Sequence, residues 1–258
     1  MIGFLIKKAF FDLWDNMLRV VLVNLGFVII LTLGFWLPFF LKFHPVTFFG
    51  SLFFVLVGFH IYIGAASKFA HEVADYKTPG FRDFFGYFRQ VWKAGLVLAA
   101  ITMAQIVLII VAFPFYMSMG GFLGTVALSV IFWASVAWQL ASQYFFAIHI
   151  RLGDGIGKTL KKCFIVMLDN TLFTVFLGIA TVLTFALSVI TAFLIPGFTG
   201  LILLHQVAFK LRLYKYDYLE EHPELSNKKN IPWDRLLEED REKVGTRTLK
   251  GMIFPWKE

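Results

Sequence analysis

The chain has 258 residues, of which 59% are hydrophobic and 16% are charged, and its formal net charge is +7. Soluble domains average roughly 25% charged residues, so this composition excludes an ordinary soluble protein and predicts an integral membrane protein. Lys and Arg gather on the cytoplasmic loops of such proteins, and without a basic recognition module the net charge does not indicate nucleic-acid binding. The single cysteine, Cys163, excludes an intrachain disulfide.

Five apolar runs predict transmembrane helices, because a helix needs roughly 20 residues to cross the hydrocarbon core of a bilayer. They are Val20–Leu41, Val46–Ala66, Ala94–Tyr116, Gly121–Ile150 and Leu172–Ile195. The first run is not followed by a small-x-small cleavage site. We therefore expect it to be a retained helix and not a cleaved signal peptide.

A sixth span is predicted after Pro196, although this run soon meets Lys210 and Arg212. Long basic side chains can reach the lipid headgroups from a helix end, so a span that extends to Leu213 is acceptable. With six spans, Lys42 alone among the 24 Lys and Arg residues lies outside the cell, as the positive-inside rule favours. The sequence thus predicts a multi-pass protein of a bacterial-type inner membrane with both termini in the cytoplasm.

Amphipathic segments precede the odd-numbered spans. Polar side chains recur at helical spacing within residues 8–19, within 82–93 and, more weakly, within 157–169. Aligning Phe10, Phe84 and Phe164 also brings the polar pairs at 15–16, 89–90 and 169–170 into register. We therefore expect an all-α domain over residues 1–219, with a threefold repeat of a surface helix followed by a transmembrane hairpin.

Neutral polar side chains lie along one face of the fourth span and one face of the fifth. The predicted spans contain no Asp, Glu, Lys or Arg before Lys210, which argues against an ion-coupled pump. Hydrogen bonding between helices is the simpler explanation of the polar faces, and a cavity for a small solute is the alternative. The residues that would line such a cavity are Asn24, His60, Gln105, Ser135, Gln139, Gln143, Thr181, Thr184, Ser188, His205 and Gln206.

The six histidines are dispersed, with no H-E-x-x-H motif and no carboxylate pairs at ligand spacing. We therefore predict no metal, no other cofactor and no catalytic constellation, and we do not expect an enzyme.

Residues 220–258 have a charged composition and predict a cytoplasmic tail with a short helix. Pro232 is placed at a helix start, and Gly245 suits a helix stop. Apolar residues in this tail are candidates for docking a protein partner or this protein's own inner face. They are Trp233, Leu236, Leu237, Met252, Ile253, Phe254 and Trp256.

Two parts of the chain resemble the YesL-like family of bacterial membrane proteins. The first runs from Phe10 to Phe27 and reads F-F-D-L-W-D-N-M-L-R followed by V-V-L-V-N-L-G-F. The second runs from Phe81 to Lys93 and reads F-R-D-F-F-G-Y-F-R-Q-V-W-K. The resemblance covers residues 1 to about 220, and the tail departs from it. It implies a multi-span protein associated with carbohydrate-uptake systems, and it transfers no functional residues.

The leading hypothesis from the sequence is a non-enzymatic accessory or scaffold subunit of a membrane complex, with transport as one such setting. It would contact membrane lipid and dock a protein partner through residues 230–258, without nucleic acid. The alternative is a small-solute transporter or channel with a neutral polar cavity between its helices.

Overall fold

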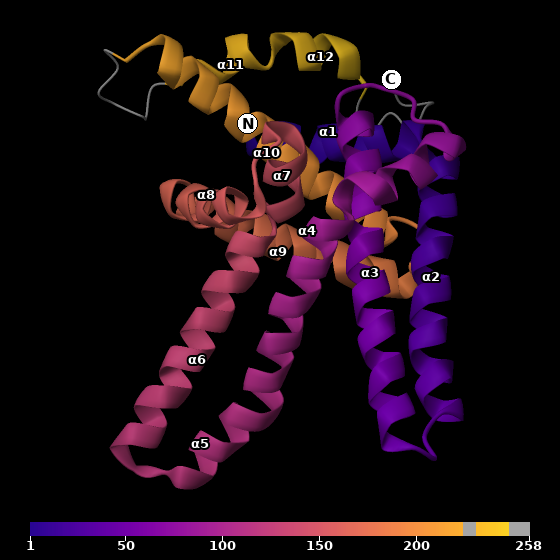
Figure 1. Ribbon diagram of the computed structural model, residues 1–258. Coiled ribbons are helices and arrows are strands. Elements are labelled where there is room, and N and C mark those ends of the chain that lie inside the picture. Colours follow the sequence, from indigo (N-terminus) through magenta and orange to yellow (C-terminus); the bar gives the residue numbers. More distant parts are fainter. Residues whose placement is uncertain (224–230, 248–258) are drawn as a thin grey trace.

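The computed structural model describes residues 1–223 and 231–247, and this part of the chain contains helices and no strands. Two long hairpins extend in the same direction from a layer of shorter helices (Figure 1). The first hairpin consists of α2 (Met17–Phe40) and α3 (Pro45–Ala74). The second hairpin extends away from this layer through α4 (Phe81–Val107), η1 (Leu108–Ala112) and α5 (Phe113–Met119). It returns to the layer through α6 (Gly121–Ser142).

The remaining helices form a layer at one end of these hairpins and a third helix pair that packs against them. The layer at that end includes α1 (Ile2–Asp15), α7 (Phe145–Leu152), α8 (Ile156–Asp169) and the short helices α11 (Trp233–Leu236) and α12 (Glu238–Val244). A third antiparallel pair consists of α9 (Thr171–Ile190) and α10 (Gly197–Glu221). Because α10 packs against α1, α2, α3 and α9, it forms the centre of the fold.

Five helical segments in the described residues are long and apolar enough to cross a membrane. They are Met17–Phe40, Pro45–Ala74, Phe81–Met119, Gly121–Leu152 and Thr171–Ile190. The prediction of an all-helical fold is thereby confirmed for the described residues, and the five segments are consistent with the predicted multi-pass membrane protein. The sixth predicted span is not among them, because the first 18 residues of its helix, α10, include His205, Gln206, Lys210 and Arg212 and are less apolar.

The surface helices agree only in part with the predicted threefold repeat. Asn16 separates α1 from α2, and Asn170 separates α8 from α9, with backbone angles outside the helical range at both positions. The second amphipathic segment behaves differently, because α4 runs without a break from Phe81 into the third span. The polar residues at 89 and 90 therefore lie within a helix, and the threefold repeat is not confirmed.

Small residues allow close helix packing at the centre of the bundle. A Cβ atom added at Gly95 of α4 would lie 2.8 Å from the Cα atom of Ile61 in α3. A Cβ atom added at Gly64 of α3 would lie 2.8 Å from the side chain of Val91 in α4. Such small-residue contacts are typical of helices that associate within membranes. They bring α3 and α4 together on one side of the cavity described below.

Candidate functional site

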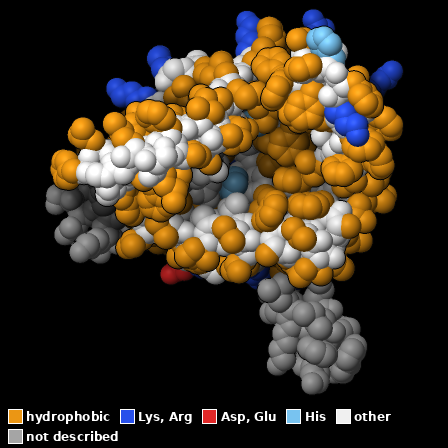
Figure 2. Space-filling view, turned by 90° about the horizontal axis from the view of Figure 1, so that it is seen from below, with side chains coloured by type: hydrophobic (Ala, Val, Ile, Leu, Met, Phe, Trp, Pro, Cys, Tyr) orange, Lys and Arg blue, Asp and Glu red, His pale blue; other side chains and the backbone are white. Residues whose placement is uncertain are grey.

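A cavity of about 1170 Å³ lies between the helices. Its walls come from α3, α4, α6, α7, α9 and α10, so both long hairpins and the third helix pair contribute. Seen from the side of the hairpin ends, the molecule has a central hollow surrounded by hydrophobic side chains, with a histidine visible inside (Figure 2). Its volume slightly exceeds the roughly 300–1000 Å³ of typical ligand pockets.

The cavity brings together most of the neutral polar residues that the sequence singled out. Seven of them line it: His60, Gln105, Gln139, Gln143, Thr181, His205 and Gln206. Among the described residues that line the cavity, none is Asp, Glu, Lys or Arg. The interior is therefore apolar with neutral hydrogen-bonding groups.

Two hydrogen-bonded histidines give the cavity part of its polar character. The Nδ1 atom of His60 lies 2.8 Å from the carbonyl oxygen of Leu56, so Nδ1 must carry a proton, and in the neutral ring Nε2 accepts from Thr102 at 3.0 Å. The Nε2 atom of His205 lies 2.8 Å from the hydroxyl of Thr181. Thr102 was not predicted, because a lone Thr in an apolar run carries no signal until His60 is placed opposite it.

Gln206 is the most buried polar residue in the cavity wall. The residue is only 1% exposed, and its Oε1 atom has no hydrogen-bond partner in the described part of the chain. Buried polar groups are almost always paired, and an unpaired one costs about 1–3 kcal/mol. Because Oε1 is itself enclosed, this unpaired atom belongs to the packed part of the wall and does not face the open space of the cavity.

Four predicted cavity residues do not line the cavity. The carboxamide of Asn24 in α2 is fully buried, donates to the carbonyl oxygens of Leu194 and Pro196, and accepts from the amide of Thr199, all at 2.9 Å. It therefore holds the turn that precedes α10. Ser188 and Thr184 donate to backbone carbonyls of their own helix, and Ser135 is also outside the lining. Hydrogen bonds within the helix explain the polar side chains of Thr184 and Ser188, and hydrogen bonds to the turn before α10 explain that of Asn24.

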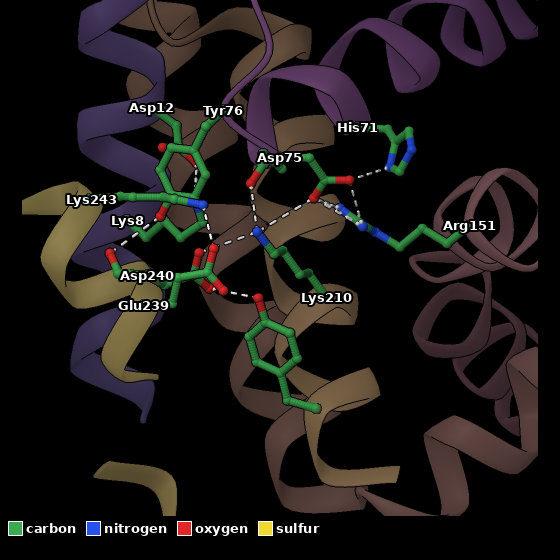
Figure 3. Close-up of polar contacts among 12 residues, drawn as sticks. Lys8, Asp12, His71, Asp75, Tyr76, Arg151, Lys210, Glu239, Asp240 and Lys243 are labelled. Carbon is green, nitrogen blue, oxygen red and sulfur yellow. Dashed lines mark hydrogen bonds and ion pairs between the residues drawn. The ribbon is translucent and has the colours of Figure 1, made fainter. Parts of the chain in front are cut away.

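Charged residues form a second group, at the end of the bundle that carries α1 and α12, which we call the charged face (Figure 3). The carboxylate of Asp75 accepts from the guanidinium of Arg151 at 3.1 Å and lies 3.4 Å from the ammonium of Lys210. Lys210 also pairs with Asp240 at 3.2 Å. These pairs join α7, α10 and α12 to the end of α3.

Burial and charge act in opposite directions on the carboxylates of the charged face. Burial raises the pKa of Asp12 to about 6, even though Lys8 lies 2.9 Å away, and burial also lowers the pKa of Lys8. Burial alone would raise the pKa of Asp75, but Arg151 and Lys210 outweigh burial and hold this pKa below its usual value. Asp75 is therefore a carboxylate that stays ionised near neutral pH.

The described part of the tail packs against this chain's own charged face. Leu237 and Val244 are at most 1% exposed. Asp240 accepts from Tyr214 at 3.0 Å, and Lys7 donates to the carbonyl oxygen of Gly245 at 3.0 Å. Leu237 is thus buried within the fold and is not free to dock a partner.

The other docking candidates have different positions. Trp233 and Leu236 are partly buried, and the guanidinium carbon of Arg212 lies 5.5 Å from the ring centre of Trp233. Met252, Ile253, Phe254 and Trp256 lie outside the described residues. No sequence pattern identified the contacts between distant helices of the charged face, because partners such as Asp75 and Arg151 are 76 positions apart.

In residues 1–223 and 231–247, no group of three or more His, Cys, Asp or Glu side chains is placed to hold a metal ion. Comparison of the chain with models of protein families, with curated proteins and with solved structures finds no match. The resemblance to the YesL-like family stays a prediction.

Proposed function

We propose that this chain is a non-enzymatic membrane protein that binds a small, uncharged solute in the central cavity and carries it across the membrane. The observation that supports this most directly is the cavity itself, a space of about 1170 Å³ in which neutral polar groups from several helices converge. Interhelical hydrogen bonding alone would leave these groups paired across closed contacts, without an open volume between them.

The lining favours a neutral solute. Moving an ion into an apolar cavity costs several kcal/mol or more unless an opposite charge receives it. The described residues of the lining offer no such charge. A largely apolar solute with a few hydrogen-bonding atoms fits both the hydrophobic wall and its carboxamides.

The charged face closes the cavity at one end. Arg151 is four residues beyond Ala147, and Lys210 is four residues beyond Gln206, so on both helices the ion pairs lie roughly 6 Å past the cavity lining. Passage of a solute to that side requires the Asp75 pairs with Arg151 and Lys210 to separate. In our proposal this face is cytoplasmic, because it carries most of the basic residues that the positive-inside rule assigns to the cytoplasm.

The contact between the two ends of the chain supports an even number of membrane crossings. Arg247 pairs with Asp15 at 2.8 Å, and Lys7 contacts Gly245, so α1 and α12 lie on the same side. With five apolar spans alone, they would lie on opposite sides. We therefore propose α10 as the sixth crossing of a bacterial-type inner membrane protein, with Lys210 and Arg212 near the cytoplasmic headgroups.

The accessory-subunit hypothesis receives less support, because the described tail helices are occupied by contacts within the chain. A docking function through residues 230–258 would require α12 to leave these contacts or would depend on the residues beyond Arg247. The resemblance to the YesL-like family agrees with a role in transport, but it names no solute.

The test is binding and flux with purified protein. Small molecules that copurify should be extracted and identified by mass spectrometry, and their uptake into proteoliposomes should be measured. Gln143→Leu, in the cavity, should reduce uptake, whereas Ser135→Ala, in the adjoining helix α6 but outside the lining, should not. Equal uptake by both variants and by empty liposomes would refute the transport proposal.

A further inference from the structure

The first part of α4, residues 81–93, carries an exposed aromatic stripe. On the face that packs against α3, Phe84 is only 6% exposed. On the outer face, Phe81, Phe85 and Trp92 are 63%, 63% and 45% exposed. These three residues are four and seven positions apart, so they lie along one side of the helix. A contiguous group of large apolar side chains is unusual on a surface that faces water, and it indicates contact with a membrane or with another protein.

A basic stripe runs beside the aromatic one. Arg82, Arg89 and Lys93 are exposed, and each lies one or four positions after an aromatic residue of the first stripe. In the part of the chain that the structure describes, their side chains form neither ion pairs nor hydrogen bonds. The nearby carboxylate of Asp83 accepts from the amide of Gly80 at 2.9 Å. The cations of the charged face, by contrast, have carboxylate partners. The basic stripe is therefore available to an external anion.

The length of this helical segment places both stripes at the level of the lipid headgroups. Phe81–Met119 has 39 residues and is therefore roughly 58 Å long, whereas the hydrocarbon core is only about 30 Å thick. The apolar run that begins at Ala94 is sufficient to cross this core. Residues 81–93 therefore extend beyond the hydrocarbon, and because they follow shortly after Asp75, they lie at the same end as the charged face.

We propose that residues 81–93 bind an anionic phospholipid, with Arg82, Arg89 and Lys93 on its phosphate groups and the aromatic stripe against the upper part of its acyl chains. Aromatic rings are favoured at the headgroup level, and clustered basic residues next to a membrane span attract anionic lipids. An acidic protein would match the charge, but it would have to displace lipid from a helix that continues into the membrane. The inference goes beyond the proposed function and does not depend on transport.

Native mass spectrometry of the full chain in neutral detergent can test the lipid class. The probes are phosphatidylglycerol and phosphatidylcholine with the same acyl chains. Each basic side chain near an anionic surface contributes roughly fivefold in affinity, so we expect one phosphatidylglycerol to bind at least about tenfold more tightly than phosphatidylcholine. The variant R82Q/R89Q/K93Q should lose this preference. Equal binding of the two lipids by the wild type would overturn the proposal.

A matched control separates a site from an effect of net charge. K42Q/K158Q/K161Q removes the same charge, and its three lysines are also exposed and without ion pairs in the described residues. This variant should keep the preference for phosphatidylglycerol. Because all six side chains are exposed, both variants should fold, which circular dichroism and thermal unfolding will check. An equal loss of preference in both folded variants would show that only net charge matters, and it would overturn the site.

Tryptophan fluorescence locates the bound lipid without any change of charge. The full chain is titrated in neutral detergent with phosphatidylglycerol or phosphatidylcholine that is brominated on the upper part of the acyl chains, since bromine quenches nearby tryptophans. The contribution of Trp92 is the emission that is lost in Trp92→Phe. This emission should be quenched at a lower concentration of the anionic lipid. If the two lipids quench Trp92 equally, or if neither quenches it, the assignment to α4 is wrong. These results leave the cavity untouched, so the transport proposal stands or falls by its own test.

Discussion

Replacing Asn24 by Leu should destabilise the protein strongly, although the substitution introduces a hydrophobic residue into a membrane helix. The buried carboxamide of Asn24 makes three hydrogen bonds of 2.9 Å to the backbone around the start of α10. Leu would leave two carbonyl groups and one amide of that turn without this partner. If each loss costs about 1 kcal/mol, the free energy of unfolding falls by about 3 kcal/mol. For a chain of this size, the melting temperature should then fall by roughly 6–12 °C.

Thermal unfolding of the purified protein in detergent measures this effect. Thr32→Val is a matched control on the same helix, because Thr32 is exposed and its hydroxyl bonds only to the carbonyl oxygen of Val28 in its own helix. Its melting temperature should stay close to that of the wild type. Gly197→Ala tests the same contact, because Gly197 has φ +62° and an added Cβ would overlap the side chain of Asn24. A folded Asn24→Leu variant as stable as Thr32→Val would refute the role assigned to Asn24.

Three further predictions concern other parts of the chain. Cys163 is fully buried and burial raises the pKa of its thiol to about 12, so maleimide should label it only after unfolding, and rapid labelling of the native protein would contradict its placement. Burial opposes ionisation of Asp240, but Lys210 and Lys8 outweigh burial and hold its pKa below the usual value. The contribution of Asp240 to tail docking should therefore persist from neutral pH to about pH 5 and disappear as the pH falls through the lowered pKa. Distances between spin labels on α1 and α12 would measure the docking of the tail at each pH. A separation of α12 from α1 already near pH 6 would argue against a lowered pKa of Asp240. Gly95→Ala should force α3 away from α4 and lower the melting temperature, whereas Gly86→Ala, where an added Cβ meets open space on the same helix, should not.

The sequence was sufficient to predict five membrane-length helices, because hydrophobic runs of that length are a local property of the chain. The polar cavity was predictable in part for the same reason, since residues such as Gln139 and Gln143 repeat at helical spacing and share a face. The pattern could not separate them from Thr184, whose hydroxyl bonds to a carbonyl of its own helix.

The contacts of the charged face could not be predicted, because they depend on how distant helices are arranged. Lys8 and Asp12 illustrate the limitation. Their spacing predicted a polar stripe on a surface helix, yet both side chains are buried, and the ammonium of Lys8 lies 3.6 Å from the ring centre of Tyr76. Periodicity identifies a polar stripe on a helix, but it does not say whether that stripe faces water or protein.

The burial of this stripe also affects how the protein is made. Lys7 contacts Gly245, which the ribosome adds 238 residues later, and at roughly 5–20 residues per second that interval is about 12–48 s. During this time α1 is already synthesised, whereas α10 and α12, which cover its polar side, are not. The amino-terminal helix is therefore among the first to be synthesised and among the last to reach its final packing, and until then lipid headgroups and water must solvate Lys8 and Asp12.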